Sequence, residues 1–316
     1  MKPDLYWTVD IGGTKMLMLL IDNQGEVLVK NKYDTPKPSE PAAIVDTISR
    51  ALLEASKEKN ITGADKPSGL GICIAGFVDH HKGLVYQSPN LEWHKPVPLG
   101  GILNDQFDCP VLIENDTNAA VVGEVYYGAA RGHDNVIYIT LSTGIGGGLF
   151  LNNRLYRGNE GFAGEIGHTK PFGKGRACKC GGNDCLETWA SGSALAGSAA
   201  TLWDENAVEN GHISTSWVFD QADGGNILAR SIIDHAANNI GLGLSNLVNI
   251  LNPSCMVIGG GVAANRTDFF HKIVININKY AIRPAVEKTP LKIVPAALEP
   301  EAGIWGIYNL LAGRAV

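Results

Sequence analysis

The chain of 316 residues is 45% hydrophobic and 18% charged, which are the proportions of a folded globular protein and exclude an intrinsically disordered one. Its formal net charge of −6 argues against a protein that holds the phosphate backbone of a nucleic acid. No window reaches the roughly 18 apolar residues of a membrane helix, and the start MKPDLYWTVD lacks a signal-peptide layout, so we expect a cytoplasmic protein without membrane attachment.

The first predicted elements recur later in the chain. Residues 8–28 (TVDIGGTKMLMLLIDNQGEVL) read as three strands joined by two turns, the first of them rich in glycine. Residues 138–158 (YITLSTGIGGGLFLNNRLYRG) repeat this pattern. The repetition predicts two related α/β domains that each start with this unit, and the chain is long enough to bury two cores.

Helix and strand patterns fill the rest of both domains. Apolar spacing predicts helices over 41–60 and 226–252, a helix directly after the strand at 110–116, and a closing helix at EAGIWGIYNLLAG. Buried strands are predicted over 68–78, 110–116 and 253–263. We place a small N-terminal domain at 1–115, joined by the C-terminal helix 301–316, and a larger domain at 116–300.

Three glycine-rich turns lie at the ends of predicted strands. Glycine lets backbone N–H groups approach phosphate oxygens, and Asp10 could hold Mg²⁺ directly or through water. A glycine-rich hairpin is often no more than a tight turn, but three at corresponding places favour a nucleotide between two lobes. The chain has no GxxxxGK[ST] loop and no GxGxxG fingerprint, which argues against the P-loop and Rossmann classes. The candidate nucleotide-binding residues are Asp10, Gly12, Gly13, Thr14, Lys15, Thr143, Gly144, Gly259, Gly260 and Gly261.

Three cysteines, Cys178, Cys180 and Cys185, cluster downstream of His168. Three thiolates and one imidazole are a donor set that tetrahedral Zn²⁺ prefers, and a full set of protein ligands makes such a site structural. The remaining cysteines lie in apolar runs and are expected to be buried free thiols, as in a reducing cytoplasm. They are Cys73, Cys109 and Cys255.

The carboxylates of Glu165 and Glu187 bracket this metal cluster in the sequence. A rigid metal-bound loop would fix their separation and direction. Together they could then form one wall of a polar ligand pocket.

Asp116 follows a predicted strand and starts a predicted helix. Its carboxylate could cap the helix, or it could act as a general base that the helix N-terminus keeps ionised. The amides of Asn115 and Asn118 suit hydroxyl ligands. Asn90 is either a turn residue or a further ligand contact.

Six segments resemble the ROK family (repressors, open reading frames, kinases) in their order and spacing. They are DIGGTK (10–15), ENDTNAA (114–120), LSTGIGGG (141–148), EGFAGEIGH (160–168), CKCGGNDCLE (178–187) and VIGGGVA (257–263). The resemblance implies an actin-like, hexokinase-like (ribonuclease H-like) two-domain α/β fold with duplicated βββαβα units and a central cleft. Two departures from the family pattern are Asp184, where glycine is usual, and Ala75, where proline is common.

The chain is most similar to the sugar kinases of this family, particularly the bacterial glucokinases. The resemblance implies that ATP, with Mg²⁺, phosphorylates the 6-hydroxyl of a hexose and that Asp116 is the base. It also implies a homodimer and a structural Zn²⁺ on His168 and the three clustered cysteines. The residues implied to hold the sugar are Gly76, Asn90, Asn115, Asp116, Glu165, His168 and Glu187.

Glucose is the expected sugar, with N-acetylmannosamine and N-acetylglucosamine as alternatives. A sugar-sensing transcriptional repressor of the same family is an alternative of a different class. Such a protein carries a DNA-binding winged helix ahead of its first glycine turn, and only nine residues precede Asp10, so we expect an enzyme.

Overall fold

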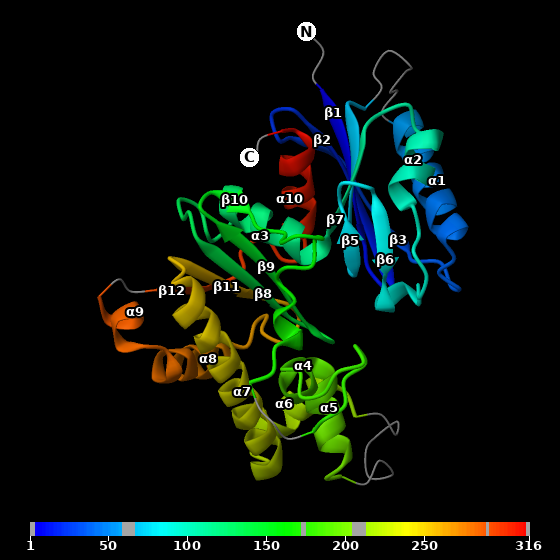
Figure 1. Ribbon diagram of the computed structural model, residues 1–316. Helices are drawn as coiled ribbons and strands as arrows, with labels where there is room; N and C mark the ends of the chain where they lie inside the picture. The colour runs from blue at the N-terminus through cyan, green and yellow to red at the C-terminus, as the bar shows by residue number, and fades with distance from the viewer. Residues whose placement is uncertain (1–3, 59–66, 172–174, 204–212, 289–290, 314–316) are drawn as a thin grey trace. The chain divides into compact units, whose positions relative to one another are not determined.

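The computed structural model describes residues 4–58, 67–171, 175–203, 213–288 and 291–313 (Figure 1). The predicted helix ends at 59–60 and 314–316 lie outside the described residues. Within the described ranges, no helix is both long enough and apolar enough to span a membrane. The chain divides into two compact units, which we call the N-terminal unit (Met1–Gly132, Leu149–Ala163 and Pro300–Val316) and the C-terminal unit (His133–Gly148 and Gly164–Glu299).

The N-terminal unit is built on a sheet with the strand order β3-β2-β1-β4-β7. Strands β1, β4 and β7 are parallel, and β2 runs antiparallel to both β1 and β3. Its elements are β1 (Leu5–Ile11), β2 (Lys15–Asp22), β3 (Val27–Asp34), α1 (Pro41–Glu58), β4 (Gly69–Ile74), β5 (Phe77–Asp79), β6 (Leu84–Gln87), the 3₁₀ helix η2 (Pro89–Leu91), α2 (Leu99–Gln106), β7 (Val111–Asn115), α3 (Asp116–Tyr126) and α10 (Ala302–Leu311).

Helices cover both faces of this sheet, which is why β2 is apolar nearly throughout. Met16, Met18 and Leu20 belong to the core that the sheet forms with α1. Leu17 and Leu19 point to the opposite face and pack with residues of α10. Because successive side chains of a strand alternate between faces, a strand buried on both sides reads as a continuous apolar run.

The second sheet has the order β10-β9-β8-β11-β12, which repeats the order of the first. This repetition confirms the predicted α/β fold built from two related halves. The remaining elements, in chain order, are β8 (Val136–Leu141), β9 (Ile145–Leu151), β10 (Arg154–Leu155), the 3₁₀ helix η3 (Ile166–His168), α4 (Glu187–Ala190), α5 (Gly192–Ala200), α6 (Thr215–Asp223), α7 (Ile227–Leu251), β11 (Cys255–Gly259), α8 (Thr267–Tyr280), α9 (Arg283–Glu287) and β12 (Lys292–Pro295).

Two details differ from the expectations. The strand expected over 68–78 is divided into β4 and β5, because the chain turns at Ala75 and Gly76. Cys73 and Cys255 are buried as expected, whereas Cys109 is only partly buried. The assignment of 1–115, joined by 301–316, and of 116–300 as two domains stays a prediction.

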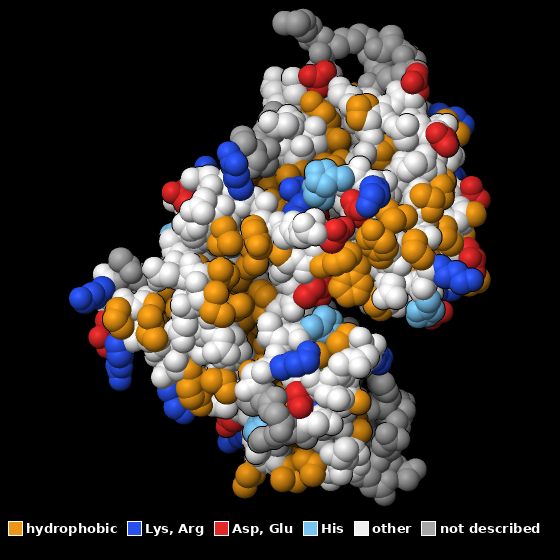
Figure 2. All heavy atoms as spheres, in the orientation of Figure 1, with side chains coloured by type: hydrophobic (Ala, Val, Ile, Leu, Met, Phe, Trp, Pro, Cys, Tyr) orange, Lys and Arg blue, Asp and Glu red, His pale blue; other side chains and the backbone are white. Residues whose placement is uncertain are grey.

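Lysine and arginine side chains are scattered among acidic and neutral ones on the face shown in Figure 2. They do not gather into one basic patch on that face.

Candidate functional site

The parallel strands of the N-terminal unit end at one edge of the sheet. Ile11 of β1 pairs with Ile74 of β4, and Ile74 pairs with Asn115 of β7. The segments that follow these strands carry candidate residues of this unit. In open α/β sheets, ligands bind at the carboxyl edge of the parallel strands.

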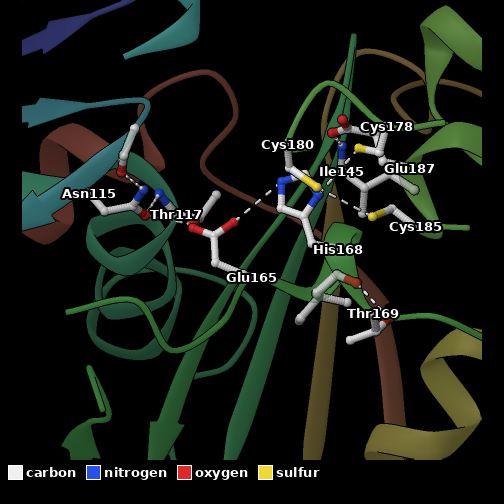
Figure 3. A network of polar contacts seen from close by, with 12 residues as sticks. Asn115, Thr117, Ile145, Glu165, His168, Thr169, Cys178, Cys180, Cys185 and Glu187 are labelled. Carbon is white, nitrogen blue, oxygen red and sulfur yellow. Dashed lines mark hydrogen bonds and ion pairs between the residues drawn. The ribbon is translucent and has the colours of Figure 1, made fainter. Parts of the chain in front are cut away.

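Asn115, and not Asp116, caps helix α3. Its Oδ1 atom accepts the backbone N–H groups of Thr117 (2.9 Å) and Asn118 (3.0 Å) and the Thr117 hydroxyl (2.7 Å), as Figure 3 shows in part. Its Nδ2 atom donates to the carbonyl oxygen of Gly76 at 3.0 Å. The amide that was expected to bind a hydroxyl is therefore occupied largely by the helix start and by the Gly76 loop.

Asp116 is the first residue of α3, directly after the cap. Its Oδ1 atom accepts the N–H of Thr117 at 2.9 Å. Burial raises the pKa of Asp116 above the usual aspartate range, although backbone hydrogen bonds at Thr117 and Asp116 act in the opposite direction. The carboxylate is thus a stronger proton acceptor than an exposed aspartate, which suits a general base at neutral pH.

Glu114, the residue before the cap, is 1% exposed and had no expected role of its own. Its Oε1 atom accepts the Asn115 N–H at 3.0 Å and Nδ2 of Asn118 at 3.1 Å. Its Oε2 atom accepts Nε–H of Arg157 at 2.7 Å. The buried carboxylate therefore connects Arg157 to the start of α3, and no local sequence pattern marks a pair so far apart in the chain.

Removing the guanidinium of Arg157 should leave this carboxylate buried without its charge partner. We expect Arg157→Met to lower the free energy of unfolding by about 2–3 kcal/mol, measured by urea denaturation. The exposed pair of Lys272 and Asp234 is the matched control, and Lys272→Met should cost under about 1 kcal/mol. Equal and small effects of both changes would contradict a supporting role for Arg157.

The turn between β1 and β2 carries the first candidate nucleotide-binding residues. The Gly12 N–H donates to the carbonyl of Lys15 at 3.0 Å, and a Cβ on Gly13 would lie 3.1 Å from the carbonyl oxygen of Asn90. Exposed Asn90 and this turn are therefore neighbours within the N-terminal unit. Thr14 is exposed, and the Lys15 ammonium forms an exposed ion pair with the carboxylate of Asp34.

The expected metal ligands lie together in the C-terminal unit. One ligand atom from each of His168, Cys178, Cys180 and Cys185 lies within 4.8 Å of all the others. Sγ of Cys180 is 3.6 Å from Sγ of Cys185, and Sγ of Cys178 is 3.8 Å from Nδ1 of His168. Figure 3 shows the imidazole and the sulfur atoms turned toward one another.

These distances fit a zinc ion. A tetrahedron with Zn–S bonds near 2.3 Å separates its sulfur atoms by about 3.8 Å. Burial and the neighbouring sulfurs raise the pKa of Cys185 to about 12, whereas a hydrogen bond from the Gly182 backbone lowers the pKa of Cys180. The Cys185 thiol would stay protonated at neutral pH without a cation, and a bound cation would stabilise its thiolate.

The cysteine loop is a small hairpin in which Asp184 stands where the family usually has glycine. Its backbone is left-handed, with φ of +61°, the conformation that favours glycine. Its Oδ1 atom accepts the N–H of Arg176 at 2.9 Å, and its own N–H donates to the Arg176 carbonyl at 2.7 Å. Asp184 thus adds a side-chain hydrogen bond to the hairpin while the four ligands stay together.

The two ring nitrogens of His168 face different groups. Nδ1 faces the cysteines, and Nε2 lies 3.8 Å from a carboxylate oxygen of Glu165 (Figure 3). Oε2 of Glu187 accepts the N–H of Ile145 at 2.9 Å, and a Cβ on Gly144 would overlap the same carboxylate. Glu165 therefore lies near another candidate residue of its own segment, and Glu187 contacts the turn that carries Gly144.

The remaining nucleotide candidates lie at the carboxyl edge of the second sheet. Strands β8, β11 and β12 are parallel, and Gly259 at the end of β11 pairs with Thr140 of β8. The turn with Thr143 and Gly144 follows β8, and the rest of the glycine triplet follows β11.

The candidate residues thus form two groups, one in each compact unit. The N-terminal unit holds Asp10, Gly12, Gly13, Thr14, Lys15, Gly76, Asn90, Asn115 and Asp116. The C-terminal unit holds Thr143, Gly144, Glu165, His168, Cys178, Cys180, Cys185, Glu187, Gly259, Gly260 and Gly261.

The chain is similar to known proteins over nearly its whole length. A family model described as "ROK family" matches residues 6–314. A glucokinase of Halalkalibacterium halodurans is 34% identical over 314 residues, which cover 95% of this chain and 93% of that protein. A xylose repressor of Caldicellulosiruptor bescii is 32% identical, over 84% of this chain and 67% of the repressor.

The fold also has a solved counterpart. The crystal structure of a ROK family glucokinase from Streptomyces griseus, in complex with glucose and AMPPNP, matches with a TM-score of 0.80 and 35% identity. The match covers 97% of this chain and 98% of that one.

Proposed function

The chain belongs to the ROK family, and on this premise we propose that it is a sugar kinase. It transfers the γ-phosphoryl group of ATP to the 6-hydroxyl of a hexose, and glucose is the proposed sugar. The glucokinases that are similar over nearly their whole length support this activity. The observation that carries the proposal is the helix cap: because Asn115 caps α3, the carboxylate of Asp116 is left to accept a proton.

Asp116 acts as the general base. As the 6-oxygen of the sugar attacks the γ-phosphorus, the carboxylate takes the hydroxyl proton, and the bond from phosphorus to the ADP oxygen breaks. Such a base contributes roughly 10²- to 10⁴-fold to the rate. Burial raises the pKa of Asp116 toward neutral pH, which makes the carboxylate a better proton acceptor. The rest of the acceleration comes from positioning the phosphates and from stabilising their charge.

The other candidate residues hold the sugar in place. The remaining hydroxyls of the sugar form hydrogen bonds with the carboxylates of Glu165 and Glu187, with Nε2 of His168 and with the amide of Asn90. Asn115 acts mainly on the protein itself, because its Oδ1 caps α3 and its Nδ2 holds the Gly76 loop.

A structural Zn²⁺ on His168, Cys178, Cys180 and Cys185 would fix the segment that ends at Glu187. Asp10, partly exposed near the end of β1, would hold Mg²⁺, which supplies positive charge against the phosphates when bound. The backbone N–H groups of Gly13 and Gly144 and the hydroxyls of Thr14 and Thr143 donate to phosphate oxygens. We also propose a homodimer, as the family resemblance implies, and a cytoplasmic location, which the free cysteines and the metal cluster favour.

The xylose repressor relative supports a second candidate function, in which the same sugar site serves a transcriptional regulator. The two functions differ in one observable. A kinase forms ADP in proportion to the sugar consumed, whereas a sugar-sensing regulator binds sugar and forms none.

The sugar is tested by a coupled assay of ADP formation over glucose, N-acetylmannosamine, N-acetylglucosamine and fructose. We expect glucose to give the highest kcat/KM, and we expect little ADP without a sugar. A higher kcat/KM for an N-acetyl sugar would replace glucose as the substrate, and ADP formation that is independent of sugar would reject the kinase.

A further inference from the structure

A carboxylate with no expected role, that of Glu299, lies at the glycine triplet of the C-terminal unit. It follows β12 closely, and β12 runs parallel to β11, with Ile258 paired to Pro295. The Ala296 N–H donates to the Ile258 carbonyl at 3.0 Å, which holds the chain beside β11 just beyond the strand. Glu299 therefore reaches the same sheet edge as Gly259.

One oxygen of this carboxylate is fixed and the other is not. Oε1 accepts the hydroxyl of the buried Tyr138 at 2.7 Å and the backbone N–H of Gly260 at 2.9 Å. No hydrogen bond from the residues that the structure describes reaches Oε2, and Glu299 as a residue is exposed. The side chain is thus held in one orientation with a free acceptor at the surface.

The three glycines of the triplet have different surroundings. A Cβ on Gly259 would overlap the Glu299 carboxylate. Gly260 has φ of +89°, and a Cβ there would overlap the backbone of Leu141. A Cβ on Gly261 would meet nothing within 4 Å, so this residue offers bare, accessible backbone beside the carboxylate.

A fixed carboxylate next to bare backbone selects for a ligand with hydroxyl donors. An ionised carboxylate only accepts hydrogen bonds, so it attracts a hydroxyl group and repels a phosphate group. The proposed kinase brings one such ligand to this turn, because the nucleotide has a ribose with two adjacent hydroxyls. We propose that Glu299 binds a ribose hydroxyl through Oε2 and makes the enzyme select a nucleoside triphosphate over inorganic polyphosphate. This inference rests on the proposed function.

The test compares wild type with Glu299→Gln and Glu299→Ala at saturating sugar. The donors are ATP, 2′-deoxy-ATP, 3′-deoxy-ATP and inorganic tripolyphosphate. Wild type should show a KM about tenfold higher for at least one deoxy nucleotide than for ATP, because a hydrogen bond to a charged group is lost. In Glu299→Ala the KM for ATP should rise about tenfold with little change in kcat, and the discrimination against that deoxy nucleotide should disappear.

A merely structural carboxylate predicts a different result. It would change kcat or the melting temperature in both variants and leave the ratio of the KM values for ATP and the deoxy nucleotides as in wild type. That unchanged ratio would overturn the proposal, as would wild-type turnover with tripolyphosphate as efficient as with ATP. Glu287→Gln, at an exposed glutamate of the same unit, is the control and should leave every ratio unchanged. Failure of the proposed function itself would be evident as no sugar phosphorylation by wild type.

Discussion

The Asp116→Asn protein should bind glucose with nearly unchanged affinity and lose turnover by about 10²- to 10⁴-fold. The amide keeps the shape of the side chain and an oxygen that can accept the Thr117 N–H, but it cannot take the proton of the sugar hydroxyl. Calorimetric titration with glucose and the coupled kinase assay measure the two quantities. Asp105→Asn, at an exposed position of α2, is the matched control and should keep wild-type kcat.

The stability of the same variant separates a catalytic role from a structural one. Burial raises the pKa of Asp116, so the ionised form is favoured less in the folded than in the unfolded protein. The carboxyl group therefore stabilises the fold at low pH, and this contribution is lost as pH rises through the folded-state pKa. At pH 7 we expect the melting temperature of Asp116→Asn to equal or exceed that of wild type. A lower melting temperature together with retained turnover would identify Asp116 as structural.

The pH dependence of kcat should report the same group. The base must be ionised, so kcat should fall as the solution becomes more acidic than the pKa of Asp116. Because burial raises that pKa, we expect the acidic limb to lie above the usual aspartate range, at a pH where exposed carboxylates are still ionised. A kcat that stays constant down to the usual aspartate range would contradict the assignment of the base.

Loss of one cysteine of the cluster should have the second large effect. We expect Cys178→Ser and Cys180→Ser to purify with little zinc, whereas wild type carries zinc that elemental analysis detects. The melting temperature should fall by about 5 °C or more, because metal binding contributes to folding. The KM for glucose should rise about tenfold, because the segment leading to Glu187 and the ring of His168 lose their common anchor.

Cys109→Ser is the control for this prediction, because its thiol lies in the N-terminal unit, outside the cluster. It should keep the zinc content and the KM of wild type. Purified wild type without zinc, or cluster variants with unchanged melting temperature and KM, would reject the structural metal.

Repeated local patterns made the fold predictable from sequence. The strand-and-turn pattern at 8–28 returns at 138–158, and both copies form the first three strands of sheets with the same order. The metal cluster was also predictable, because His168 and the cysteines are close in sequence and have few other reasons to be so. Their ligand atoms do lie within 4.8 Å of one another.

The start of α3 shows where local patterns fail. Asn115 and Asp116 are adjacent, and asparagine and aspartate are nearly equal as helix caps. A shift of the helix start by one residue therefore decides which of the two side chains caps the helix and which can bind a ligand. The position of the helix start depends on two contacts of Asn115. Its side-chain amide donates to the Gly76 carbonyl, and its backbone N–H donates to the Glu114 carboxylate. Glu114 in turn depends on a distant arginine, and Glu299 on a distant tyrosine, and contacts of this range have no local signal.

Phosphorus NMR of the product formed from ATP and glucose tests the kinase most directly. We expect glucose 6-phosphate in amounts equal to ADP from wild type, and almost none from Asp116→Asn in the same time. Phosphate on another hydroxyl, or inorganic phosphate released with the sugar left unchanged, would contradict the proposed kinase.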